Sequence, residues 1–290
     1  MNISKLGLIA GNGRFPFLVL EEALKRDIPV VVAAIREEAS PEIEDFASQS
    51  QVSLHWLGLG QLGKLIRLFK KEEVRKVVMA GQVKHVQIFS REGSDSLMPR
   101  VILPDLKMAR LFMSLPHKNT QSLIGGVIRE LEKEGMHFID STELLQPLIA
   151  EAGVLTQRKP DSNETRDMEY GRPVAREIAR LDLGQTIVVK DQAVVAVETM
   201  EGTDETIRRA ARLVKGGRLT VIKVSRPHQD MRFDVPVVGM DTLQVLQECN
   251  VSALSLDAGT TLILDLESFI QEADRQKMTV VAEASQNRDD

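Results

Sequence analysis

The sequence predicts a two-domain α/β protein. A doubly wound, mostly parallel sheet is expected to form the N-terminal half, joined by a linker to a C-terminal mixed α/β (α+β) domain. In the first half, apolar strand-like runs alternate with amphipathic helical stretches, whereas the second half contains a hairpin pattern and acid-rich segments. The chain of 290 residues is long enough for two domains of ordinary size, and 43% hydrophobic residues give each half a core.

The N-terminal half reads as strands separated by helices. Strands are expected at Leu6–Ala10, Pro29–Ala34, Val52–His55 and Lys76–Ala80. Helices are expected up to Lys25, at Gly60–Lys71 and at about Thr120–Glu134. The helix at 60–71 has apolar residues at helical spacing and lysines on its other face. Because strands separated by helices pair in parallel, residues 1–134 are predicted to form a right-handed, Rossmann-like domain.

The second half has a different pattern. We place the boundary near Gly135, a C-cap for the preceding helix, and expect the second domain over residues 137–284. Thr186–Lys190 and Ala193–Val197 flank a two-residue turn and predict a hairpin. The polar stretch Thr156–Arg166 predicts an exposed loop, and the polar tail Ser285–Asp290 is expected to be disordered. The remaining predicted elements are a helix at Thr206–Lys215 and strands at Leu219–Val224, Ala253–Leu256 and Thr261–Leu264.

The composition argues against several classes of function. The net charge is −5, the basic residues are spread along the chain and aromatic residues make up 4%, so we expect no nucleic-acid binding. Cys249 is the single cysteine and reads as a packed thiol, which excludes an intrachain disulfide and favours a reducing compartment. No signal peptide or membrane-spanning run is recognised, so a cytoplasmic location is expected.

A glycine-containing loop follows the first strand. Gly11, Asn12 and Gly13 lie where a doubly wound sheet places a phosphate-binding loop. The third glycine of the dinucleotide pattern is replaced by Pro16, so the fingerprint of an NAD-dependent oxidoreductase is absent. The loop is therefore either a tight strand-to-helix turn or a nucleotide or phosphate contact. The segment Gly81–His85 follows the fourth strand, and its lysine and histidine are either solvent-facing or further ligand contacts at the same edge.

An acid-rich segment lies where a strand gives way to a helix. Glu198, Glu201, Asp204 and Glu205 fall within eight residues. Thr203 is a candidate N-cap, and the acids that follow it suit the positive end of a helix. Glu198 and Glu201 precede that helix, and their oxygens suit Mg²⁺ or Mn²⁺.

The most informative segment is Gln229–Asp234. It combines two carboxylates with the nearby cations Lys223, Arg226 and Arg232. Carboxylates such as Asp230 and Asp234 hold divalent ions or orient water, and the cations neutralise phosphate oxygens. A salt-bridged surface loop is the alternative interpretation.

Four segments together resemble the LpxI-type UDP-2,3-diacylglucosamine pyrophosphatases, namely residues 7–16, 181–191, 196–205 and 229–236. The similarity runs from about Leu6 to Val281. It implies a magnesium-dependent hydrolase of lipid A biosynthesis, with a lipid-linked nucleotide sugar as substrate. The implied reaction splits UDP-2,3-diacylglucosamine into 2,3-diacylglucosamine 1-phosphate (lipid X) and UMP, with water attacking the sugar-side phosphorus.

Site residues are assigned on this combined basis. Catalysis is assigned to Asp230, Asp234 and Arg232, and binding of Mg²⁺ or Mn²⁺ to Asp230, Asp234, Glu198 and Glu201. Contact with the substrate and its phosphates is assigned to Gly11, Asn12, Gly13, Lys223, Gln229 and Thr203. One departure from the family is His117–Thr120, which stands where a Gly-Asp-Asp-like segment is expected.

Other readings remain open on the sequence. A non-catalytic nucleotide-sugar or lipid-binding module is the alternative function. A homodimer is considered for the assembly, and peripheral contact with the inner face of the inner membrane is considered for the location.

Overall fold

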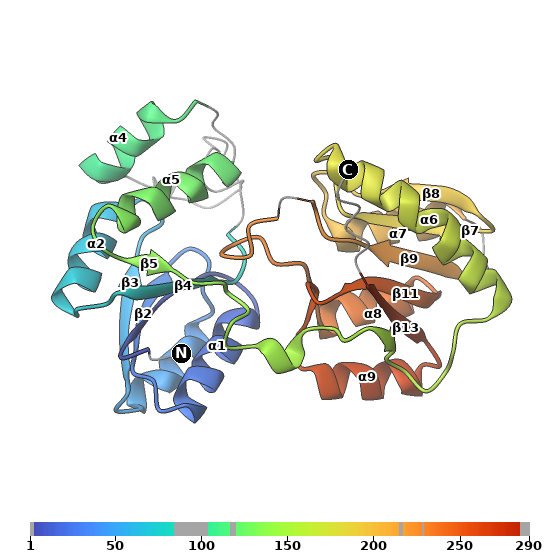
Figure 1. Cartoon of the computed structure of the whole chain (residues 1–290), viewed down its shortest axis with the longest axis horizontal. Coiled ribbons are helices and arrows are strands. Elements are labelled where there is room, and N and C mark those ends of the chain that lie inside the picture. Colours follow the sequence, from blue (N-terminus) through green and yellow to red (C-terminus); the bar gives the residue numbers. More distant parts are fainter. Residues whose placement is uncertain (1–2, 84–103, 117–119, 215–216, 228, 285–290) are drawn as a thin grey trace, which may run out of the picture. The chain divides into compact units, whose positions relative to one another are not determined.

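The computed structural model describes residues 3–83, 104–116, 120–214, 217–227 and 229–284, which divide into two compact units (Figure 1). The first unit comprises the chain up to Leu145 together with Met231–Phe233, and the second comprises the remainder. The division falls after Leu145 rather than near Gly135 because β5 (His137–Phe138) still pairs with the first sheet. The tail expected to be disordered lies outside the described residues.

The first unit contains a five-stranded sheet in the order β3-β2-β1-β4-β5, and all of its pairings are parallel. Its other strands are β1 (Leu6–Ala10), β2 (Val30–Ile35), β3 (Val52–Leu57) and β4 (Lys76–Ala80). Both β1 and β2 are buried along their whole length, as expected for strands covered on two faces. The fold class predicted from the sequence is confirmed.

The helices of the first unit are α1 (Phe15–Lys25), η1 (Pro41–Ser48), α2 (Leu62–Lys71), α4 (Leu106–Ser114) and α5 (Thr120–Glu132). One core joins α2, α4 and α5 to one face of the sheet. Helix α4 was not predicted, and it begins at Asp105, whose side chain accepts from the amides of Lys107 and Met108. The same carboxylate accepts from the Gly63 amide at 2.6 Å, which joins the starts of α4 and α2.

The second unit contains a six-stranded mixed sheet in the order β6-β13-β11-β9-β7-β8. Its strands are β6 (Gly153–Val154), β7 (Thr186–Lys190), β8 (Ala193–Val197), β9 (Leu219–Lys223), β11 (Val251–Ala258) and β13 (Thr279–Ala284). A separate two-stranded sheet pairs β10 (Val237–Val238) with β12 (Leu262–Ile263). The predicted hairpin is confirmed as β7 and β8, and its turn residues Asp191 and Gln192 both have positive φ, at 49° and 59°.

Helices cover both faces of this sheet. They are α6 (Ser162–Arg180), α7 (Thr203–Leu213), α8 (Met240–Glu248) and α9 (Leu266–Arg275), with the short η2 (Gln146–Leu148) at the start of the unit. The first core cluster packs α7, α8 and α9 against one face, and a smaller cluster packs α6 against the other. No helix within the described ranges is long and apolar enough to cross a membrane.

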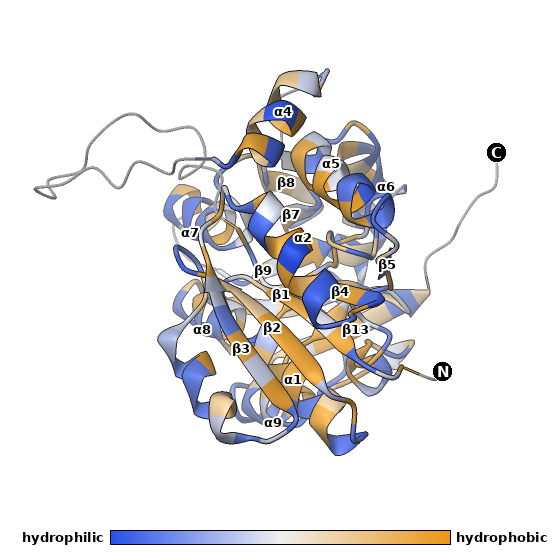
Figure 2. Cartoon of the chain, turned by 90° about the vertical axis from the view of Figure 1, so that its left-hand side faces the viewer, coloured by the Kyte–Doolittle hydropathy of each residue, from blue (hydrophilic) through white to orange (hydrophobic). Residues whose placement is uncertain are grey.

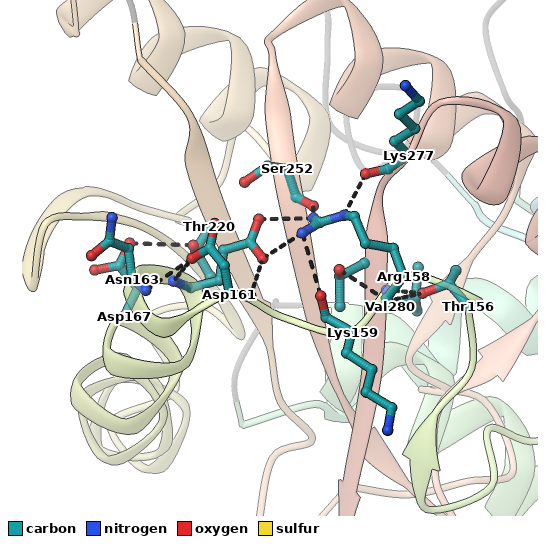
Figure 3. A network of polar contacts seen from close by, with 12 residues as sticks. Thr156, Arg158, Lys159, Asp161, Asn163, Asp167, Thr220, Ser252, Lys277 and Val280 are labelled. Carbon is teal, nitrogen blue, oxygen red and sulfur yellow. Dashed lines mark hydrogen bonds and ion pairs between the residues drawn. The ribbon is translucent and has the colours of Figure 1, made fainter.

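The loop predicted at Thr156–Arg166 is wrong in its second part, because α6 begins at Ser162. A capping box starts this helix: Asp161 accepts from the Glu164 amide at 2.9 Å, and Glu164 accepts in return from the Asp161 amide at 2.9 Å. Arg158 binds both oxygens of Glu164 at 2.8 Å and also the Ser252 carbonyl (Figure 3). The start of α6 is thereby fixed to β11.

Candidate functional site

The candidate site of the second unit is built around Lys223, the last residue of β9. Alternate residues of a strand share a face, so its side chain points with Leu219 and Val221 towards the face that α7 covers. The side chain is 6% exposed. Its Nζ donates to Oγ1 of Thr203, the first residue of α7, at 3.1 Å. A buried cation therefore lies beneath the start of a helix.

The charges of three carboxylates act on this cation. Burial lowers the pKa of Lys223, and the nearby charges of Glu198, Asp204 and Asp234 raise it in opposition, while Arg226 lowers it further. The positive end of a helix also disfavours an ammonium group. The carboxylates oppose these effects only in part, because the pKa of Lys223 stays below its ordinary value.

Glu198 follows β8 directly and is 8% exposed. One carboxylate oxygen accepts from the Thr203 hydroxyl at 2.9 Å, and the other accepts from the Gln185 amide at 3.2 Å. Gly184 leaves room for this arrangement, because a Cβ there would lie 2.1 Å from the Glu198 carbonyl oxygen. The Thr203 hydroxyl thus links Glu198 to Lys223.

The first turn of α7 differs from its interpretation in the sequence. Gly202, with a φ of 82°, is the N-cap, so the interpretation of Thr203 as the capping residue is wrong. Asp204 was attributed only to the helix dipole, but burial raises its pKa, against the effect of Lys223, and Asp241 raises it further. The position of Asp204 in an acid-rich helix start gave no indication of this burial.

Glu201 is engaged on the other side of this turn. Its carboxylate accepts from Arg209 at 2.6 Å, from the Thr206 hydroxyl at 3.2 Å and from the Thr199 hydroxyl. The hydrogen bond from Thr199 is the largest cause that lowers the pKa of Glu201 to about 2, with Arg209 contributing. The metal-binding role assigned to Glu201 stays a prediction, and in this structure its partner is an arginine.

The loop after β9 holds two further charged groups. Arg226 Nη1 lies 2.9 Å from Asp234 Oδ2, and its Nε lies 3.1 Å from Asp182 Oδ1. The Gln229 side chain accepts from the Arg226 amide at 2.9 Å, whereas its buried Nε2 has no hydrogen-bond partner in the described part of the chain. The Asp234 amide donates to the Asp230 carbonyl at 2.8 Å, so these two aspartates share one turn.

A buried network supports the start of this loop. The Ser225 amide donates to Asp257 at 2.8 Å, at the carboxyl end of β11. Arg172 of α6 binds the other oxygen of Asp257, and its guanidinium also contacts Ser255 at 2.8 Å and Glu283 at 3.2 Å. The backbone beside Lys223 is therefore held by a network from β11, β13 and α6.

The segment Met231–Phe233 belongs to the first unit. Arg232 pairs with Glu132 of α5 at 3.1 Å. The Ser141 amide donates to the Met231 carbonyl at 3.0 Å, and the Ser141 hydroxyl donates to the Arg232 carbonyl at 2.6 Å. Phe233 packs against the core of the first unit. Within the segment Gln229–Asp234, Arg232 therefore belongs to the first unit, whereas Asp230 and Asp234 belong to the second.

The glycine loop lies at the carboxyl ends of the neighbouring strands β1 and β4. The strand order of the sheet reverses between these two strands, which is where sheets of this kind bind ligands. The Gly11 amide donates to the last carbonyl of β4 and the Gly13 amide to the Asn12 side chain, both at 2.8 Å. The Asn12 and Gln82 backbones bind each other at 2.8 and 3.0 Å. Gly81 is close as well, since a Cβ there would lie 2.5 Å from the Asn12 carbonyl oxygen. The loop amides are used within the protein, and phosphate contact by this loop stays a prediction.

Two predicted features lie outside the described residues. These are Lys84 and His85 after β4, and His117–Asn119 where the family-like acidic segment was expected.

The fit of a divalent metal depends on the oxygen donors present. Mg²⁺ is typically held by one or two carboxylates together with water and substrate phosphates. The structure, as far as it is described, contains no group of three or more His, Cys, Asp or Glu side chains placed to hold a metal ion. Asp230 and Asp234 share a turn. The charge of Glu198 is already opposed by the ammonium group of Lys223. Binding of a divalent metal by Asp230, Asp234, Glu198 and Glu201 therefore stays a prediction, and the described acids do not by themselves form a closed metal site.

Comparison with known proteins covers nearly the whole chain. The model of the LpxI N-terminal domain matches residues 5–148, and the model of the LpxI C-terminal domain matches residues 151–281. A UDP-2,3-diacylglucosamine pyrophosphatase LpxI from Caulobacter vibrioides is 31% identical over 295 residues, which cover 98% of this chain and 99% of that relative. The resemblance predicted from the four sequence segments is confirmed, and the chain belongs to the LpxI family.

Proposed function

We propose that the protein is a magnesium-dependent UDP-2,3-diacylglucosamine pyrophosphatase that releases 2,3-diacylglucosamine 1-phosphate and UMP. The relative from Caulobacter vibrioides carries this activity in its name and aligns over nearly the full length of both chains. A lipid-linked nucleotide sugar is accordingly the proposed substrate.

The observation that carries the proposal is the buried charge cluster around Lys223. A diphosphate is strongly anionic, and its hydrolysis adds charge to the leaving phosphate. Cations fixed in a poorly hydrated site stabilise such charge far better than mobile surface cations do. Lys223 and Arg226 are fixed in this way, by Thr203 and by Asp234 respectively.

The residues divide the chemistry between them. Water adds its oxygen to the sugar-side phosphorus, the bond from that phosphorus to the bridging oxygen breaks, and UMP leaves with the bridging oxygen. The water must lose a proton, which we assign to a carboxylate, either Asp230 or Asp234. A bound Mg²⁺ would neutralise phosphate oxygens. Lys223 and Arg226 stabilise the departing UMP.

The decisive assay uses the full chain with UDP-2,3-diacylglucosamine carrying a radiolabelled diphosphate. Release of labelled UMP with Mg²⁺, and its loss with excess chelator, is the expected result. In water enriched in ¹⁸O, the heavy oxygen should enter 2,3-diacylglucosamine 1-phosphate and be absent from UMP. Tight binding without turnover under any divalent ion would favour a binding module instead.

Replacing the buried cation gives a residue-level test. Lys223→Met should lower turnover by roughly 100-fold or more, because the leaving charge loses its fixed counter-charge. Lys159→Met changes an exposed lysine of the same unit and should leave turnover unchanged. Wild-type turnover in Lys223→Met, with the fold verified by circular dichroism, would remove this residue from the mechanism.

We also propose that the enzyme works in the cytoplasm. An enzyme in the cytoplasm would reach a lipid substrate at the inner face of the inner membrane. Cell fractionation with a tagged chain tests the location, and sedimentation velocity tests the homodimer. Recovery of the folded chain from the periplasm would contradict the cytoplasmic assignment.

A further inference from the structure

We propose that the outer faces of α2 and α4 form a surface that docks on an anionic phospholipid bilayer. This α2–α4 surface consists of Lys64, Arg67 and Lys71 of α2 and Leu106, Arg110 and Met113 of α4. It lies within the first unit, and the inference goes beyond the proposed function because it requires no catalysis and no residue of the second unit.

Helix α2 has a basic outer face. Its inner face buries Leu62, Leu65, Ile66 and Phe69. The exposed side chains of Lys64, Arg67 and Lys71 are spaced three and four residues apart, so they share the opposite side of the helix. The helix contains no acidic residue. In the described ranges, the ion pairs of this region join Glu134 to Lys70 and Lys107, which leaves the three outer cations without an acidic partner.

Helix α4 is apolar on two opposite faces. Leu111 and Leu115 point into the core of the first unit. Leu106 and Met113 nevertheless are 67% and 76% exposed, and the exposed Arg110 lies between them in the sequence. Spacings of four and three residues place these three on one side of the helix. Two large apolar side chains therefore face solvent beside a cation.

The two outer faces adjoin each other. A surface hollow of about 740 Å³ is lined by Arg67 of α2 and by Leu106 and Arg110 of α4, among other residues. Asp105 binds the first turn of α2 while capping α4, which holds the two helix starts together. Both helices mix hydrophilic and hydrophobic residues along their length (Figure 2). Arg67, Leu106 and Arg110 thus open onto the same space, which Asp105, Glu130 and Glu134 also line.

This combination fits a bilayer better than other occupants. Lipid phosphates attract basic side chains, and exposed Leu and Met side chains can enter the boundary between headgroups and acyl chains. Nucleic acid would match the cations and would leave the apolar pair without a role. A second copy of the same surface would bring like charges together. The local basic charge also runs against the net charge of −5, so it is a feature of this face and does not reflect the whole chain.

The test measures flotation of the full chain with vesicles, without substrate. Vesicles of phosphatidylethanolamine with phosphatidylglycerol should bind the protein, and pure phosphatidylcholine vesicles should not. Lys64→Gln with Arg67→Gln and Lys71→Gln should weaken binding by roughly 100-fold, at about five-fold per charge. Leu106→Ser with Met113→Ser should weaken it by roughly ten-fold. Raising the salt concentration to about 0.5 M should reduce wild-type binding to the level of the charge variant.

Matched control variants change exposed residues elsewhere. Arg36→Gln with Arg75→Gln and Arg212→Gln removes the same charge, and Leu213→Ser with Met240→Ser removes comparable apolar groups. Both controls should bind vesicles as the wild type does. The proposal is overturned if the wild type ignores anionic vesicles or if the controls lose as much binding as the α2–α4 variants. It is also overturned if the apolar variant alters only the sedimentation of an oligomer, or if the charge variant loses only binding to duplex DNA. Because no turnover is measured, failure here leaves the proposed function standing.

Discussion

The hydroxyl of Thr203 connects two buried charged groups of the candidate site. It donates to Glu198 and accepts from Lys223, so one side chain fixes both at the start of α7. The sequence indicated these residue types by their positions at strand and helix ends. It could not indicate Asp182 or Gln185, because their contacts depend on tertiary packing around Arg226 and Glu198.

Glu201 provides a prediction on pH. Its pKa in the folded protein is about 2, below the ordinary value of 4.5 for a glutamate. A lowered carboxyl pKa contributes stability that is complete above the unfolded value and is lost as the pH falls towards the folded value. Glu201→Gln should therefore unfold at a lower temperature than the wild type at pH 7, and the difference should shrink as the pH falls from about 4.5 towards about 2.

The measurement is thermal unfolding of both proteins across this pH range. Glu42→Gln, at an exposed position of η1, serves as a control with no such trend. A constant offset between wild type and Glu201→Gln at all pH values would show that the ionised carboxylate is not the source of the effect.

At the scale of elements, the parallel strands of the first unit and the β7–β8 hairpin follow from periodicity and turn position. Other elements escape this reasoning for physical reasons. Helix α4 has apolar residues on opposite faces, so no single apolar stripe marks it. Helix α9 was not predicted either, although Leu266, Phe269, Ile270 and Ala273 lie at helical spacing and pack against the core. The polar start of α6 resembles a loop, although its Asp161-x-x-Glu164 spacing is typical of a capping box.

The contact between the β1 and β4 loops gives an element-scale prediction. Gly81 and Gly13 have nearly the same φ, at 89° and 90°, but only Gly81 is pressed against backbone. Gly13→Ala should cost about 1–2 kcal/mol through conformational strain alone. Gly81→Ala should cost at least about 2 kcal/mol more, because the Asn12 backbone must move away. Chemical denaturation measures both, and equal costs would show that the close approach is not maintained in solution.

On the scale of the whole molecule, the first unit depends on residues from late in the chain. Phe233 packs against its core, and Ser141 binds the backbone of the two preceding residues. Local pattern analysis cannot detect such a dependence, because residues 141 and 231 are far apart in the sequence and neither lies in a predicted strand or helix. The contact boundary lies later than the sequence boundary because β5 still pairs with β4.

Phe233→Ala tests this dependence in the intact protein. Loss of a partly buried aromatic side chain should destabilise the first unit by about 1–3 kcal/mol. Amide hydrogen exchange should rise in β4, β5 and α5, and the strands of the second unit should keep their protection. Phe269→Ala, at a fully buried position of the second unit, should give the reverse pattern. Equal loss of protection in both units after Phe233→Ala would indicate that they unfold as one body.

Because Met231–Phe233 belongs to the first unit, exchange of the two halves between related genes is constrained. Recombination between related genes near residue 148 would keep each family-model domain whole but would separate these three residues from the surface they pack against. In a chimera made at that point, residues 231–233 of one parent would pack against the N-terminal core of the other parent. Residues 231–233 and the core of the first unit are therefore expected to change together during evolution, although they are encoded in different halves of the gene.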